Sequence, residues 1–208
     1  MTIRKKLLIT IACLSVILCT LLTGTIAWLT DNTDAITNEF KPSIVSIKLT
    51  EEGLASNSNT QYFKMVPGVV RDKKATVTVT NDIDCYVFLK VEKKNNYDDF
   101  IKHAIADGWN PLDGEDGIYY REVTADATTK QFGILGAGSF NFGEKVFTWA
   151  NDQVLIRPDI TKEKMAEFYN EDGTEKTGTS HPALTFTAYA CQKEGFASPA
   201  EAWAEASE

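Results

Sequence analysis

Alternation between apolar and polar side chains dominates this chain beyond residue 42 and constrains its fold more than any other feature. Val45, Ile47 and Leu49 alternate with polar residues, and a period of two is typical of a strand with one buried face. Comparable alternating or β-branched runs occupy 75–80, 85–91, 118–123, 145–150, 154–157 and 184–191. So many strands with so few helical segments predict a mainly β fold, namely an antiparallel β-sandwich of jelly-roll type with two or three short helices.

The connections between these segments indicate one domain over residues 43–208. Residues 81–84 have turn composition, so we expect 75–80 and 85–91 to form a hairpin. Polar or glycine-rich connectors lie at 51–60, 107–117 and 170–180. None of them is long enough to separate two domains, and the chain shows no internal repeat.

Three segments depart from the β pattern and predict short helices. Apolar residues have helical spacing in 97–105 and in 161–169, which is typical of surface helices lying on a sheet. The third segment, 198–205, begins with Ser198 followed by proline, and a glutamate comes three residues after the serine. These are the residues of a capped helix start, and we expect Trp203 of this helix to pack on the body.

The first 27 residues have the organisation of a secretory signal peptide. Arg4, Lys5 and Lys6 precede an apolar run, and small residues stand one and three positions before the bond between Ala27 and Trp28, where we expect cleavage. The alternative is a permanent membrane anchor, because residues 7–29 carry no charge and are long enough to cross a bilayer. In both cases the chain from Trp28 onward lies outside the cytoplasm, so the protein is expected to be secreted.

The charge of the exported chain excludes several kinds of partner. The full sequence has 21 basic and 29 acidic residues, a net charge of −8. Removal of the three basic residues of the leader leaves 18 basic against 29 acidic residues, a net charge of −11. Such a surface repels nucleic-acid phosphates and anionic lipids. We therefore expect no nucleic-acid partner, and membrane contact only through an uncleaved leader.

After cleavage the chain keeps two cysteines, Cys85 and Cys191. An oxidising exterior favours a disulfide between them where the geometry allows it. Strand parity, however, places Cys85 on a face with Val87 and Leu89, whereas Cys191 shares its face with Tyr189. The sequence leaves two interpretations open, one disulfide or two separate buried thiols that pack like small apolar residues.

No set of residues in this chain has the spacing of a catalytic or metal site. His103 and His181 are the only histidines, and neither lies in a zinc-binding motif, so we expect ordinary solvated side chains. The glycines of 133–138 do not match a dinucleotide-binding fingerprint. Four acidic residues between two strands are compatible either with a calcium-binding loop or with a solvated turn. They are Asp107, Asp113, Glu115 and Asp116. The sequence predicts no enzyme and no cofactor.

Large aromatic residues allow a second functional interpretation. An exposed platform of such rings would bind carbohydrate, and a cell-surface adhesion module is the main alternative function. Core packing is the commoner use of large aromatic residues in a β-sandwich, and we favour it here. The residues concerned are Trp28, Trp109, Trp149, Trp203, Tyr119 and Tyr120.

An ordered set of short motifs resembles the TasA/camelysin family. The set begins with 25–31 at the export signal and continues with 38–40 and 47–51. It also includes Val66-Pro67-Gly68, 85–87, Gly108-Trp109, 118–120, 184–192 and Ala202-Trp203. The resemblance implies a jelly-roll subunit of biofilm-type extracellular matrix fibres of Gram-positive bacteria, exported through a signal peptidase of SipW type. It also implies self-assembly, with matrix accessory proteins as further partners. Camelysin-type relatives are described as metallopeptidases, which is the weaker alternative because the zinc ligands are missing here.

The same resemblance implies that the N-terminal segment of one subunit adds as a strand to the next. Residues 28–42 would form an arm before the domain, with apolar residues at Trp28, Leu29, Ile36 and Phe40. An isolated arm cannot bury these side chains, but an open sheet edge offers backbone partners and pockets. Head-to-tail addition does not close and therefore grows into a filament. The alternatives are pairing of the arm within its own domain, or an unstructured remnant of the leader.

Overall fold

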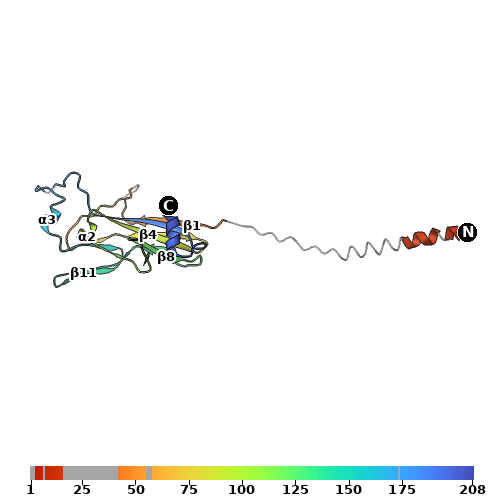
Figure 1. The fold of residues 1–208 in the computed structure, drawn as a ribbon. Coiled ribbons are helices and arrows are strands. Elements are labelled where there is room, and N and C mark those ends of the chain that lie inside the picture. The colour runs from red at the N-terminus through yellow and green to blue at the C-terminus, as the bar shows by residue number, and fades with distance from the viewer. Residues whose placement is uncertain (1–2, 7, 16–41, 55–57, 173) are drawn as a thin grey trace. The chain divides into compact units, whose positions relative to one another are not determined.

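A computed structural model describes residues 3–6, 8–15, 42–54, 58–172 and 174–208 (Figure 1). The chain divides into two units, 1–41 and 42–208. Residues 3–6 and 8–15 are helical, and no helix within the described ranges combines the length and apolarity needed to span a bilayer. The predicted cleavage point, Ala27 and Trp28, lies outside the described residues, as do the arm residues Leu29, Ile36 and Phe40.

The 42–208 unit is mainly β, with several antiparallel sheets and few short helices, as the alternation predicts. One sheet has the order β1-β3-β9, formed by Val45–Glu51, Ala75–Asn81 and Gln131–Gly133. A second has the order β14-β4-β8-β7, formed by Ala183–Gln192, Cys85–Lys94, Ile118–Val123 and Asn110–Pro111.

Three smaller sheets complete the β structure of the described residues. The order β2-β13-β5 joins Val70–Asp72, Gln153–Ile156 and Ile101–Lys102, and β10 (Leu135–Gly136) pairs with β6 (Ala104–Ile105). β11 (Gly138–Phe142) and β12 (Lys145–Trp149) form a hairpin that extends to one side of the unit (Figure 1). The helices are α2 (Tyr97–Phe100), α3 (Lys162–Met165) and α4 (Pro199–Ala206).

β4 lies at the centre of the core because both of its faces are buried. On one face, Val87 and Leu89 pack with Val77 and Val79 of β3. On the other face, Phe88 belongs to a second cluster of buried apolar side chains that includes α4. The two layers of apolar contacts share this single strand, so β4 couples the β1-β3-β9 sheet to the C-terminal helix.

The predicted hairpin between β3 and β4 is wrong. β3 pairs with β1 and β9, whereas β4 pairs with β14 and β8. Residues 81–84 therefore carry the chain from one sheet to another. Asn81 stabilises this connection between the two sheets, because its side-chain amide donates to the carbonyl oxygens of Ile83 at 2.8 Å and Thr124 at 3.2 Å. Both faces of β4 are apolar, so β3 stabilises the fold by covering one of them rather than by extending the same sheet.

The predicted helix 97–105 is wrong beyond its first turn. α2 ends at Phe100, and Ile101 is extended and pairs with Ile156 of β13. Asn95 and Asn96 have positive φ angles of 57° and 53° and turn the chain out of β4, a conformation that asparagine tolerates better than most residues. Pairing with a distant strand overrides the helical spacing of the apolar residues in this segment.

The other two predicted helices are present, and α3 is shorter than expected. In α3, the hydroxyl of Thr161 accepts a hydrogen bond from the backbone N–H of Lys164 at 3.2 Å, but the helix ends at Met165. In α4, Ser198 caps the first turn by accepting from the N–H of Glu201 at 3.2 Å. The predicted packing of Trp203 is confirmed, since its ring centroid lies 5.4 Å from that of Phe88.

The long strands define two ends of the 42–208 unit. At the exit end, β1 begins with Val45 opposite Asn81, and β14 finishes with Gln192 opposite Cys85. At the α2 end, β14 begins opposite Lys94 and the chain enters α2. Figure 1 shows α2, α3 and the β11–β12 hairpin at one end of this unit, away from α4. The arm predicted for residues 28–42 precedes the exit end along the chain.

Candidate functional site

The candidate site is an open side of the domain formed by two edge strands. β1 and β14 are terminal strands of their sheets and lie close to each other. Within the described ranges no ladder joins them, and each pairs with a single strand, β3 or β4. Each strand therefore has one side along which its backbone N–H and C=O groups lack a strand partner. We call this surface the β1–β14 edge.

Core side chains are incompletely covered along the β1–β14 edge. Ala188 and Phe186 of β14 face the core and are only partly buried. Their partners on β4, Leu89 and Val91, are 0% and 8% exposed. On β1, Leu49 is 37% exposed although it lies opposite Val77, which is fully buried. The edge thus combines backbone groups that have no strand partner among the described residues with apolar surface that another strand would bury.

β14 lacks the features that usually protect a sheet edge. Natural edge strands carry charged residues, prolines or bulges that discourage the addition of further strands. The run 183–192 contains no charged residue and no proline. On β1, Lys48 is exposed and is the one charge between 45 and 50. β14 is therefore the side of the edge more open to addition of a strand.

A buried ion pair lies where β1 ends, towards the α2 end. Lys73 Nζ is 2.6 Å from Glu51 Oε1, and the two side chains are 10% and 15% exposed. The same ammonium group lies 5.3 Å from the ring centroid of Phe186 in β14 and 5.9 Å from that of Phe63. These contacts connect the end of β1 to β14 without a backbone ladder.

The two cysteines are free and face opposite sides of one sheet. Cys191 lies opposite Tyr86, whereas Gln192 lies opposite Cys85, as the strand parity indicates. Burial raises the pKa of Cys85 to about 11 and also raises the pKa of Cys191. The structure thus shows two separate thiols of low reactivity and no disulfide between them.

His103 differs from the expectation of an ordinary solvated side chain, whereas the side chain of His181 is 39% exposed. His103 lies between β5 and β6 rather than on a surface helix. Burial lowers its pKa to about 4, and its ring is 5.4 Å from that of Tyr97 in an edge-on contact. His181 stacks on Phe168 at 5.3 Å, with Nε2 3.3 Å from Glu175.

No cluster with the composition of a metal site is present in the described part of the chain. Groups of three or more histidine, cysteine, aspartate or glutamate side chains placed so that they could hold a metal ion do not occur there. His103 does border a hollow of about 680 Å³, together with Asp98, Asp116 and Tyr119. Burial keeps this imidazole uncharged at neutral pH.

The tryptophans of the predicted carbohydrate platform are buried where the structure describes them. Trp109, Trp149 and Trp203 are 6%, 7% and 8% exposed. The indole N–H groups of the first two donate to the carbonyl oxygens of Gly133 at 2.9 Å and Gly136 at 3.1 Å. Tyr119 and Tyr120 are half-buried neighbours on β8. Core packing therefore accounts for these rings, and Trp28 lies outside the described residues.

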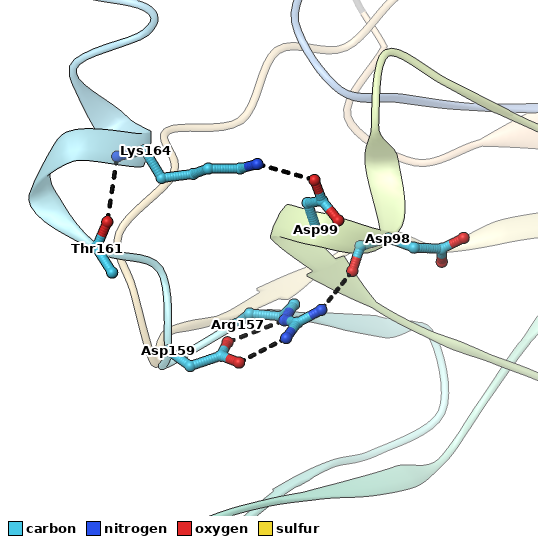
Figure 2. A network of polar contacts seen from close by, with 6 residues as sticks. All are labelled: Asp98, Asp99, Arg157, Asp159, Thr161 and Lys164. Atoms are coloured by element: carbon cyan, nitrogen blue, oxygen red, sulfur yellow. Dashed lines mark hydrogen bonds and ion pairs between the residues drawn. The ribbon is translucent and has the colours of Figure 1, made fainter.

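Sequence reasoning missed a polar network that shapes the α2 end (Figure 2). Arg157 binds both carboxylate oxygens of Asp159, at 2.9 and 2.5 Å, and donates to the carbonyl oxygen of Asp98 at 2.7 Å. Lys164 of α3 pairs with Asp99 of α2 at 2.9 Å. The hydrogen bonds from Arg157 lower the pKa of Asp159. No local spacing signals the contacts that Arg157 makes with Asp98 and Lys164 makes with Asp99, because they join residues about 60 positions apart.

Comparison with known proteins assigns no family to this chain. No protein-family profile matches the chain, and no curated protein is similar to it. The resemblance to the TasA/camelysin family therefore stays a prediction drawn from the motifs.

Proposed function

We propose that this protein is a secreted structural subunit of extracellular matrix fibres. In this proposal, the arm of one copy, residues 28–42, adds as a strand to the β1–β14 edge of another. The observation that carries the proposal is the state of β14, a long edge strand with no charge, no proline and core-facing side chains that are only partly buried. Such an edge is a template for strand addition.

The arm has suitable length and composition to fill this edge. Residues 28–40 span about 43 Å when extended at ~3.3 Å per residue, against about 33 Å for the ten residues of β14. Apolar side chains at Trp28, Ile36 and Phe40 all have even numbers and would therefore share one face of a strand. That face would cover the half-buried side chains of the β1–β14 edge.

Three further features complete the proposal. The fold would be a β-sandwich of jelly-roll type, in which the sheets containing β3 and β4 enclose the core that they share. Export would use a signal peptidase of SipW type, and fibres would associate with matrix accessory proteins. Head-to-tail addition of identical subunits uses two different surfaces and therefore yields an open filament.

Electron microscopy of the chain beginning at Trp28 tests the proposal. We expect filaments from this chain and none from the same chain without residues 28–40. A full-length arm with its apolar residues replaced by serine should also give none. A matched control replaces polar arm residues instead and should keep the filaments. The apolar set consists of Trp28, Leu29, Ile36 and Phe40. The polar control set consists of Thr30, Thr33 and Thr37.

Two results would contradict the proposal. Polymers of undiminished length from the shortened chain would show that the arm is not the connecting strand. Monomers in every sample, at concentrations up to the solubility limit, would favour an arm paired within its own domain and a soluble binding or accessory module.

A further inference from the structure

A hollow of about 680 Å³, which we call the His103 hollow, lies near the α2 end between two walls of the domain. One wall is the end of β4 with the turn that leads into β8, where the N–H of Val91 donates to the carbonyl oxygen of Gly117 at 2.8 Å. A Cβ atom at Gly117 would lie 2.6 Å from that of Val91's carbonyl oxygen, so glycine permits this close approach. The other wall is the segment 103–105. Ligand pockets commonly enclose about 300–1,000 Å³, so the hollow can hold a small molecule.

The backbone at His103 is held from both sides. Ile101 pairs with β13, whereas Ala104 pairs with β10 of another sheet. The imidazole also contacts the ring of Tyr97 edge-on, with 5.4 Å between the ring centroids. The hydroxyl of Tyr97 is buried and has no hydrogen-bond partner among the described residues. The wall therefore presents a positioned imidazole, and beside it lies a buried hydroxyl whose hydrogen bonds are unmade.

The uncharged groups that line the hollow suit a polar ligand without charge. Burial lowers the pKa of His103 to about 4, so at neutral pH one ring nitrogen donates a hydrogen bond and the other accepts one. Tyr119 lines the hollow and is half-buried, and Val91 and Ile105 add apolar surface. An apolar wall with a few fixed polar groups is typical of a small-molecule site.

Charged side chains also line the hollow, and their charges balance. They are Glu92, Lys93, Lys94, Asp98 and Asp116. Lys93 Nζ is 3.1 Å from Asp98, and Glu92 is 3.4 Å from Lys90 Nζ. Figure 2 shows that the carboxylate of Asp98 points away from Arg157, which binds the carbonyl oxygen of the same residue. Among the described residues that line the hollow or pair with its lining, acidic and basic side chains are equal in number, so neither an anion nor a cation gains net attraction.

We propose that the His103 hollow binds a neutral sugar residue of a glycan. Sugar hydroxyls donate and accept at once, so they can bond to the imidazole of His103 and to the charged side chains at the same time. The apolar C–H face of the sugar would pack against Tyr119. The hollow shares only Tyr119 with the predicted aromatic platform. The proposal does not depend on strand addition, and it gives the domain a second role as an attachment point for glycan.

Nuclear magnetic resonance of the imidazole rings tests the proposal at neutral pH. The chain contains two histidines, so His181 serves as an internal control. The chain begins at Trp28 and carries serine at the apolar arm positions, because filaments would broaden the signals. The neutral probes are the methyl glycosides of glucose, galactose, mannose and N-acetylglucosamine. Glucuronate and glucosamine are the charged counterparts.

We expect at least one neutral sugar to shift the ring signals of His103 in a saturable way, with a dissociation constant in the millimolar range, while those of His181 stay in place. His103→Phe keeps a ring beside Tyr97 but removes both nitrogens. Followed through backbone amide signals, it should weaken binding of that sugar about tenfold, whereas the matched variant His181→Phe should not weaken it. Asp116→Ala lies on an exposed turn, leaves the core intact and should weaken binding about threefold.

Three results would overturn the inference. No shift of the His103 signals by any neutral sugar at about 50 mM, well above the millimolar range, would remove the site. Stronger shifts with glucuronate or glucosamine than with the neutral sugars would contradict the neutral class of ligand. Unchanged affinity in both His103→Phe and Asp116→Ala would place the binding elsewhere. Since the assay uses chains that do not assemble, its outcome is separate from that of the filament experiment.

Discussion

The Lys73–Glu51 ion pair offers the sharpest test of how the β1–β14 edge is built. Lys73→Met removes the ammonium group but keeps the length of the side chain and a favourable sulfur contact with the rings of Phe63 and Phe186. The main effect is then a carboxylate on Glu51 that is 15% exposed and has lost its partner. Breaking a buried pair from one side costs about 3–5 kcal/mol.

The residual exposure of the two side chains places the expected loss in the free energy of unfolding near the lower end of this range. Side-chain exposures of 10% and 15% leave some water at the ion pair, so we expect a loss of about 3 kcal/mol in the free energy of unfolding. With a urea m-value of roughly 1.5–2 kcal/mol/M, the unfolding midpoint falls by about 1.5–2 M. Urea titration of the chain beginning at Trp28, at a concentration too low for assembly, measures this shift.

The neighbouring lysine supplies a matched control. Lys74 pairs with Glu52 at 3.0 Å, but these side chains are 56% and 73% exposed, and Lys74→Met should leave the midpoint unchanged. The double variant Lys73→Met with Glu51→Leu removes both charges and should regain most of the lost stability. Equal midpoints for Lys73→Met and Lys74→Met would show that burial does not determine the strength of the ion pair.

Further predictions concern the core, a histidine and the thiols. Trp203→Ala should lower the free energy of unfolding by about 3–5 kcal/mol, because the ring is 8% exposed and packs on a central strand; calorimetry measures this. His103 takes up its proton near pH 6.5 when unfolded and near pH 4 when folded, so acidification through this window destabilises the fold by up to about 3 kcal/mol. A His103→Gln variant should lack this loss of stability on acidification. An identical dependence of the free energy of unfolding on pH in both proteins would contradict the prediction. Cys85 and Cys191 should each react with an alkylating reagent after unfolding in urea, and a chain that takes up no reagent would instead contain a disulfide.

Much of the local structure is predictable from the sequence because its causes are local. The alternation around Val45–Thr50 places β1 almost to the residue, and the run at 118–123 coincides with β8. The serine, proline and glutamate at the start of α4 satisfy the first-turn N–H groups within a few residues of one another. Parity along a strand also anticipates that Cys85 and Cys191 face opposite sides, because successive side chains alternate.

The candidate site depends on partner choice, which a local pattern does not contain. The absence of charge in β14 is visible in the sequence, but its position at a sheet edge follows from pairing with β4, about 100 residues earlier in the chain. The same holds for the environment of His103, where strand pairing at Ile101 replaces the expected helix and buries the imidazole. Long-range contacts decide which side chains lose their water.

From the residue pattern alone one can predict where most strands lie, where the last helix begins, and that the chain carries a leader-like N-terminus and an acidic body. Side-chain period, capping and charge act over a few residues, so they can be read along the chain. Only long-range packing places β3 and β4 in different sheets and leaves β1 and β14, among the described residues, without a strand partner on one side. Covering both apolar faces of β4 stabilises the whole domain, and this requirement outweighs the turn at 81–84 that would otherwise have closed a hairpin.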